Sequence, residues 1–223
     1  MAKILPANLE RLHSSQHRAL IFDCDGTVGD TMGLHYAAWK QTLRDFGAAA
    51  IDVPWEKFCG EGGRDVRISI REFAEQCGLS IDGDRFLAHM DALFERYLPY
   101  HRPIGPVISF INSETRPMAV ASSGFRKNVR YVIDHCGLSE KIRAVVTRED
   151  VTGGGVVRTK PAPDLFLIAA ERLKTIPTRC LVFGDSPLDG QAAAAAGMDF
   201  FRVPQDWWDP ALRDFDWERA PSA

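Results

Sequence analysis

The sequence predicts an α/β fold with a mainly parallel sheet flanked by helices and an inserted all-helical subdomain. Short apolar runs of strand length alternate with segments of helical periodicity along most of the chain. After the first run, only helical spacing occurs for about seventy residues, which is too long for one crossover between parallel strands. At 223 residues with 45% hydrophobic content, the chain can bury a core for one or two domains.

The first apolar run, Ala19–Phe22, has the length and continuity of a buried parallel strand, and Gly26 then starts a turn. Because alternate residues of an extended chain project to the same side, Asp23 and Asp25 can reach the same space. Two carboxylates at the end of a strand suit a divalent cation and phosphoryl chemistry. An ordinary acidic turn is the alternative. A calcium loop is disfavoured, because the glycine comes too early and no bidentate glutamate follows.

The inserted segment is predicted from apolar residues at helical spacing and from the glycines between them. We expect helices over residues 31–46, 55–58, 66–73 and 86–98. The proline- and glycine-rich stretch 100–106 is typical of a linker that returns the chain to the sheet. These boundaries give a core of residues 1–30 and 103–223 and a helical domain of residues 31–102.

Strand and helix patterns alternate again in the second half of the chain. We expect strands at 118–121, 144–146, 181–183 and 200–203, with helices over 126–136 and 163–173 and around 192–196. In such a sheet, ligands bind beyond the carboxyl ends of the strands. This rule gathers Asp23, Asp25, Ser122 and Asp185 at one edge, although they are far apart in the sequence.

Composition narrows the partners and the compartment. The net charge of −3 and the absence of a Lys/Arg-rich run disfavour nucleic acid and anionic membranes, so we expect a small-molecule partner. Five scattered cysteines without a Cys-x-x-Cys motif fit reduced thiols. No apolar stretch resembles a signal peptide or spans a bilayer. We therefore expect a cytoplasmic protein, as a monomer or a weak homodimer.

Four motifs together resemble the haloacid dehalogenase-like superfamily, in the branch of β-phosphoglucomutase and its sugar-phosphate phosphatase relatives. The motifs are Phe22–Thr27 (FDCDGT), Ala121–Gly124 (ASSG), Lys160–Asp164 (KPAPD) and Gly184–Asp189 (GDSPLD). Each motif is weak alone, but all four occur in the family's order and spacing between about Ala19 and Val203. The resemblance implies a Rossmann-like core and a helical cap domain over the active site.

The resemblance also implies roles for four acids of the core. Asp23 would be the nucleophile that forms an aspartyl-phosphate, and Asp25 would be the general acid and base. Mg²⁺ would be bound by the Asp23 carboxylate, the Asp25 backbone carbonyl and Asp185. Asp189, one helical turn after Asp185, would support these ligands from behind.

Further residues are expected to hold the phosphoryl group. Ser122 would donate to its oxygens, with Ser123 and Gly124 also binding substrate, and Lys160 would supply positive charge to the transition state. The alternatives are a helix N-cap role for Ser122 and a solvated surface position for Lys160.

Three residues of the inserted segment match substrate-binding positions of the mutase-like branch, namely His35, Gly60 and Arg64. His35 could instead be an ordinary helix-face histidine. Trp39 also matches a position of that branch, but packing is the more common role for such a residue.

The chain departs from the mutase at several positions. Cys59 stands where the mutase has a lysine, and Phe125-Arg126 stands where it has the Lys-Asn pair that grips a second phosphate. These losses favour hydrolysis, although Arg64 and Arg126 could compensate. Gly184 replaces a glutamate, which removes one acid from the expected metal site. We therefore predict a Mg²⁺-dependent phosphatase acting on a small phosphate ester such as a sugar phosphate. A mutase, or a non-catalytic binding or regulatory protein on the same fold, is the alternative.

Two segments have no assigned role. The stretch 152–159, with Gly153–Gly155, is longer than usual in the family and is expected to be a mobile loop. The tail, Gln205–Ala223, is rich in aromatic residues and is expected to lie over the core. Its aromatic residues are Trp207, Trp208, Phe215 and Trp217.

Overall fold

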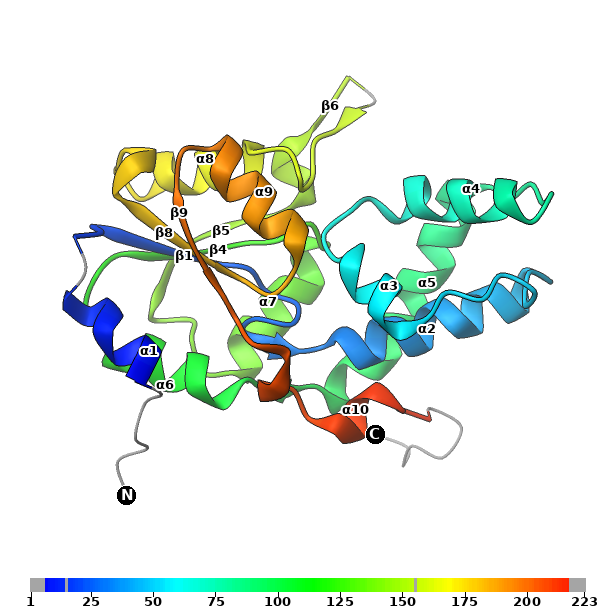
Figure 1. The fold of residues 1–223 in the computed structure, drawn as a ribbon, viewed down its shortest axis with the longest axis horizontal. Coiled ribbons are helices and arrows are strands. Elements are labelled where there is room, and N and C mark those ends of the chain that lie inside the picture. Colours follow the sequence, from blue (N-terminus) through cyan, green and yellow to red (C-terminus); the bar gives the residue numbers. More distant parts are fainter. Residues whose placement is uncertain (1–6, 15, 155, 217–223) are drawn as a thin grey trace.

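The computed structural model describes residues 7–14, 16–154 and 156–216. Its central sheet has five parallel strands in the order β5-β4-β1-β8-β9, so the first strand of this sheet in the chain lies in the middle (Figure 1). The strands are β1 (Ala19–Phe22), β4 (Met118–Ala121), β5 (Ile142–Val146), β8 (Cys180–Gly184) and β9 (Asp199–Arg202). The predicted α/β fold is confirmed.

Helices cover both faces of the sheet, because its strands are apolar on both sides. Ile21 and Val182 pack on one face with α8 and α9, whereas Leu20 and Phe183 pack on the other with α1, α6 and α7 (Figure 1). These helices are α1 (Ala7–Glu10), α6 (Gly105–Ser113), α7 (Arg126–His135), α8 (Asp164–Arg172) and α9 (Pro187–Ala195). Neighbouring residues of one strand thus belong to different apolar clusters, as the alternation of a strand requires.

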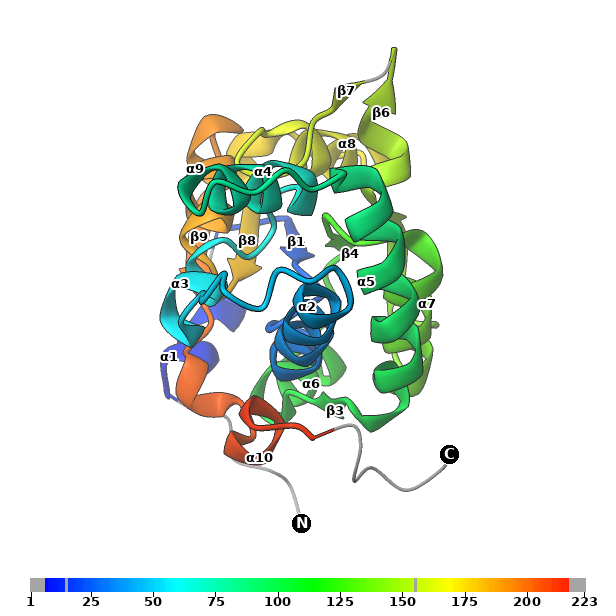
Figure 2. The same cartoon turned by 90° about the vertical axis from the view of Figure 1, so that its right-hand side faces the viewer.

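Four helices, which we call the cap, lie to one side of the sheet (Figure 1), and Figure 2 views the molecule from that side. They are α2 (Met32–Asp45), α3 (Trp55–Gly60), α4 (Val66–Gln76) and α5 (Gly83–Tyr97). The chain enters the cap through β2 (Gly29–Asp30) and returns through β3 (Arg102–Pro103), and these two strands pair antiparallel. Each of the four predicted helices of this segment is present; the division of the chain into two domains stays a prediction.

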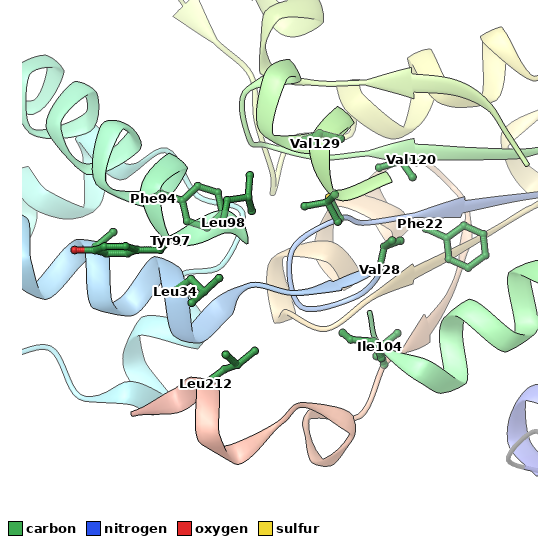
Figure 3. Close-up of a cluster of buried hydrophobic side chains, with 14 of the residues drawn as sticks. Phe22, Val28, Leu34, Phe94, Tyr97, Leu98, Ile104, Val120, Val129 and Leu212 are labelled. Atoms are coloured by element: carbon green, nitrogen blue, oxygen red, sulfur yellow. The ribbon is translucent and has the colours of Figure 1, made fainter. Parts of the chain in front are cut away.

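Local sequence explains where the cap helices begin. The Asp65 carboxylate accepts the Arg67 backbone N–H at the start of α4, and the Asp82 carboxylate accepts two backbone N–H groups at the start of α5. The apolar stripes of the cap join the core in one continuous cluster. Figure 3 shows Leu34 and Phe94 of the cap in this cluster with Phe22 of β1.

The tail contacts both parts of the molecule. Trp208 Nε1 donates to the carbonyl of Gly26 at 2.8 Å, and the Asp209 N–H donates to Asp30 Oδ2 at 2.5 Å. Leu212, in α10 (Pro210–Arg213), is buried in the same apolar cluster (Figure 3). The tail therefore lies over the core as expected, and it also crosses the junction with the cap. Trp217 lies outside the described residues.

Two features differ from the sequence-based expectation. The predicted linker contains the first residues of α6, because Pro106 is tolerated in the first turn of a helix. The expected loop forms a short antiparallel pair, β6 (Thr152–Gly153) with β7 (Val156–Val157), and Gly155 lies outside the described residues.

The 3₁₀ helices are η1 (Arg11–Ser14), η2 (Leu98–Tyr100), η3 (Arg148–Val151), η4 (Pro177–Arg179) and η5 (Gln205–Trp207). Within the described residues, none of the helices has the length and apolarity to cross a membrane.

Candidate active site

Three adjacent strands deliver the polar groups of the site. β1 pairs with β4 on one side and with β8 on the other. Asp23, Ser122 and Asp185 directly follow these strands, so the register of the sheet places all three at one edge. The structure therefore places Asp23, Ser122 and Asp185 together at one edge of the sheet, as the sequence predicts.

Lys160 is buried at this edge between two carboxylates. Its Nζ lies 2.5 Å from Asp23 Oδ1 and 2.7 Å from Asp189 Oδ1, and the residue is 1% exposed. Burial alone would lower the pKa of Lys160, but Asp189 and Asp23 raise it, so the ammonium form is favoured. The surface alternative for Lys160 is therefore wrong. The lysine also fixes the orientation of the Asp23 carboxylate.

Asp23, Asp185 and Asp189 form a compact acidic cluster. One carboxylate oxygen from each lies within 4.8 Å of the other two, and all three residues are buried. Burial raises the pKa of Asp23 to about 7 and the pKa of Asp185 well above its usual range. With three carboxylates against one lysine, the cluster carries surplus negative charge when ionised. Its oxygen ligands fit a hard divalent cation.

Gly184 lies directly beside the side chain of Asp189. A Cβ at Gly184 would lie 2.5 Å from Cβ and Cγ of Asp189, so the Asp189 side chain occupies the space that a residue at 184 would use. This contact adds no acid to the site, so the expectation of one acid fewer at position 184 stays a prediction. Asp189 is oriented by the start of α9, where its Oδ2 accepts the N–H and hydroxyl of Ser186.

Asp25 lies beside the acidic cluster with its own hydrogen bonds. Its carboxylate accepts the Thr31 hydroxyl at 2.7 Å and the Ser122 hydroxyl at 3.4 Å, and His35 Nε2 lies at 3.2 Å. Burial would raise the pKa of Asp25, but His35 and the hydrogen bonds from His35 and Thr31 outweigh it and lower the pKa. His35 is held in place by stacking on Phe94, with ring centroids 3.6 Å apart.

The turn after β4 offers donors to an anion. The Gly124 N–H donates to Ser122 Oγ at 3.0 Å, while Ser123 Oγ is buried with no hydrogen-bond partner among the described residues. An unpaired buried hydroxyl is costly unless a ligand satisfies it. The N-cap of α7 is Phe125, so the alternative role of Ser122 as a helix cap is not observed.

The cap approaches the core through Gly62 and Gly63, two glycines that were not predicted as site residues. A Cβ at Gly63 would lie 3.1 Å from Cδ of Lys160, and one at Gly62 would lie 3.4 Å from Ser186. Gly60 is exposed at the end of α3, and a Cβ there would meet no described atom within 4 Å. The structure does not bring Gly60 to the site, and its role in substrate binding stays a prediction.

Arg64 lines the cavity but is already paired. Its guanidinium contacts Glu72 at 2.6 and 2.8 Å and Glu61 at 2.8 Å. The arginine's positive charge is thus compensated by two acids of the cap. Any contact with substrate would compete with these ion pairs.

The cavity between cap and core has an apolar cap side. Its apolar lining on the cap includes Trp39, Phe58, Val66, Phe73, Met90 and Phe94. The core residues that line it without having been predicted as site residues include Asn128 and Arg148. Arg148 follows β5 by two residues, so its position at the carboxyl edge of the sheet is a signal that could have identified it.

Comparison with known proteins places the fold and motifs in context. A family model described as haloacid dehalogenase-like hydrolase matches residues 17–197. Fructose-1-phosphate phosphatase YqaB of Escherichia coli K12 is 30% identical over 187 residues, covering 82% of this chain and 95% of that protein. β-Phosphoglucomutase of Bacillus subtilis 168 is 25% identical over 194 residues, covering 81% and 80%. A hydrolase structure from Pseudomonas syringae has a TM-score of 0.72 and 25% identity, covering 88% and 89%.

Proposed function

Because the chain belongs to the haloacid dehalogenase-like hydrolase family, we propose that it is a Mg²⁺-dependent phosphatase of a small phosphorylated metabolite of the sugar-phosphate class. The observation that carries the proposal is the buried contact of Asp23 with Lys160, next to Asp185 and Asp189. A relative of this chain is named as a fructose-1-phosphate phosphatase.

Asp23 is the proposed nucleophile. Its free oxygen attacks phosphorus, the ester oxygen leaves with a proton from Asp25, and an aspartyl-phosphate forms. Lys160 supports this step in two ways, because it orients the carboxylate and remains positively charged as negative charge develops on the phosphoryl oxygens. Ser122, Ser123 and the backbone N–H groups of their turn would hold those oxygens.

Asp25 then acts as the base for hydrolysis. It takes a proton from water as the water attacks the aspartyl-phosphate, which releases inorganic phosphate and restores the Asp23 carboxylate. The contacts of Asp25 with His35 and Thr31 favour its ionised form, as a base requires. A bound phosphoryl dianion acts in the opposite direction and favours the protonated form that the first step needs.

The acidic cluster fits the Mg²⁺ that the family implies. Asp23 and Asp185, supported by Asp189 and the backbone carbonyl of Asp25, would hold the ion. The ion would neutralise charge on the phosphoryl group during transfer. The surplus negative charge of the three carboxylates over the single lysine supports this assignment.

A phosphosugar mutase is the second candidate, since a relative is named β-phosphoglucomutase. A mutase must hold the non-reacting phosphate of a bisphosphate, which requires cations that are free to bind it. Arg64 is paired with Glu61 and Glu72, and Arg126 is paired with Asp150 at 2.8 Å. These pairs weaken the compensation that the sequence left open and favour hydrolysis. A non-catalytic protein is disfavoured, because its signature would be a broken motif and the four motifs are intact.

One incubation separates these candidates. The protein is mixed with β-glucose 1-phosphate, Mg²⁺ and a trace of the 1,6-bisphosphate, alongside a panel of other sugar phosphates. We expect inorganic phosphate from members of the panel, complete loss of release with EDTA, and recovery on adding excess Mg²⁺. Catalytic accumulation of glucose 6-phosphate would establish the mutase instead. Phosphate release at full rate in EDTA would contradict the metal site.

A further inference from the structure

Arg148 is a buried cation at the edge of the cavity. It lies at the start of η3, two residues beyond the end of β5, on the same sheet edge as Asp23, Ser122 and Asp185. The residue is 8% exposed and lines the cavity between cap and core. Its guanidinium stacks on the ring of Phe125, with the central carbon 4.5 Å from the ring centroid.

The acid nearest to Arg148 is already occupied by another arginine. Arg148 Nη2 lies 3.6 Å from Asp65 Oδ2, which is beyond normal hydrogen-bond distance. Arg67 contacts the same carboxylate at 2.6, 3.0 and 3.2 Å, and its backbone N–H donates to it as well. Asp65 therefore compensates Arg67 first, and Arg148 receives only a weak share of its charge.

The other charged groups near Arg148 do not neutralise its positive charge. Glu149 and Asp91 attract it and Arg67 repels it. Asp91 is engaged by Asn128 at 2.8 Å and by Lys127 at 2.9 Å. Burial disfavours the charged guanidinium and lowers the pKa of Arg148. A buried cation with weak compensation is costly in the empty cavity and attracts an anion that enters it.

We propose that Arg148 binds a carboxylate on the leaving group of the substrate, so that the preferred substrates are phosphate esters of hydroxy acids or sugar acids. This inference rests on the proposed phosphatase function. The planar guanidinium matches a carboxylate in bidentate fashion, and Phe125 holds its plane. A second phosphate fits less well, because a dianion needs several cations and the cap arginine that lines the cavity, Arg64, is already paired with Glu61 and Glu72.

A matched pair of substrates tests the proposal. 3-Phosphoglycerate and glycerol 3-phosphate have the same carbon chain but differ by a carboxylate in place of a hydroxymethyl group. We expect the wild-type protein to prefer 3-phosphoglycerate in kcat/KM. In Arg148→Met, the ratio of the two kcat/KM values should fall by about 10- to 100-fold, as loss of a charged hydrogen-bond pair predicts. Arg148→Lys should restore part of the ratio.

Two control variants separate charge recognition from a structural role. Arg126→Met removes an arginine that is paired with Asp150 and is not among the described residues lining the cavity, so the ratio should stay unchanged. Asp65→Asn keeps an acceptor for the start of α4 but removes the competing acid. If Arg148 acted only by joining Asp65 to the core, Asp65→Asn would lower the ratio as Arg148→Met does. We expect it to leave the ratio equal or higher.

Binding to an inactive variant distinguishes failure of this inference from failure of the proposed function. In Asp23→Asn, titration calorimetry with Mg²⁺ should give tighter binding of 3-phosphoglycerate than of glycerol 3-phosphate, and Arg148→Met should remove the difference. Equal affinities in the Arg148-containing protein would overturn the role of Arg148, whatever the enzyme hydrolyses. A carboxylate preference in binding without any phosphate release by the wild type would overturn the phosphatase assignment alone.

Discussion

The core side and the cap side of the cavity are built from different chemistry. On the core side, Asp23, Lys160 and Asp189 are buried and linked by ion pairs of 2.5 and 2.7 Å. On the cap side, aromatic and aliphatic residues dominate, and the guanidinium of Arg64 is neutralised by its own acids. The contrast teaches that the sheet positions the buried, ion-paired groups, whereas the cap contributes most of the apolar lining.

The largest expected effect is the loss of activity when a carboxylate on the core side of the cavity is removed. Asp23→Asn keeps the shape of the side chain but removes the nucleophile, so we expect kcat to fall about 10³-fold or more on every substrate. Steady-state phosphate release measures this loss, and a thermal melt controls for folding. A variant that keeps more than a few per cent of the wild-type rate would contradict the assignment of Asp23.

The second expected effect is a gain in stability from a substitution at the junction between core and cap. Burial raises the pKa of Asp30 in β2 to about 6, against 3.8 for an ordinary aspartate. The folded protein therefore holds this proton more tightly than the unfolded chain, and stability falls as pH rises from about 4 to about 6. Asp30→Asn lacks this penalty and can still accept the N–H of Asp209. We expect it to be more stable than wild type at pH 7, by up to about 3 kcal/mol.

Denaturant unfolding at several pH values measures this difference. The gain of Asp30→Asn should shrink toward zero as the pH approaches 4, where both proteins carry a neutral group at position 30. Asp52→Asn, which changes an exposed acid of the cap, controls for the loss of one negative charge. A gain that does not depend on pH would mean that the buried charge of Asp30 is not its cause.

The smallest expected effect is a loss in kcat/KM when a glycine of the cap is replaced. Gly63 has φ of +92° and lies against Lys160, so Gly63→Ala adds both backbone strain and a close contact where the cap meets the core. A cost of about 1.4 kcal/mol would lower kcat/KM about tenfold. Gly78→Ala, just after α4, is the matched control, because Gly78 also has a positive φ of +67° but a Cβ there would meet no described atom within 4 Å, so kcat/KM should stay unchanged. Equal losses in both variants would remove the distinction between the two glycines.

The order of strands and helices was predictable because local patterns determine it. Apolar runs such as Met118–Ala121 are bounded by turn residues, and the structure places that strand at the predicted residues. The antiparallel pairs of two-residue strands were not predictable from the sequence. β2 and β3 contain two residues each and depend on contacts across the chain, and Pro106 suggested a linker where α6 begins.

The core part of the site was predictable from the ends of the strands and from the four motifs. The motif residues Asp23, Ser122 and Asp185 could be placed together, because adjacent parallel strands end at one edge. The cap residues depend on how helices pack on the core, which sequence spacing does not specify. Spacing alone therefore does not single out Gly62 and Gly63, the glycines that lie against the core. Arg148 is a core residue outside the four motifs, and only its place two residues after β5 marks it.

The position of β1 in the middle of the sheet has a mechanical consequence. This strand is hydrogen-bonded to β4 on one side and β8 on the other, so it cannot shift without disrupting two ladders at once. The Asp23 carboxylate that follows β1 is thus attached to a strand that is held on both sides. The cap is attached through two strands of two residues each. We therefore expect any widening or narrowing of the cavity to displace the helical segment, while the Asp23 carboxylate stays in place.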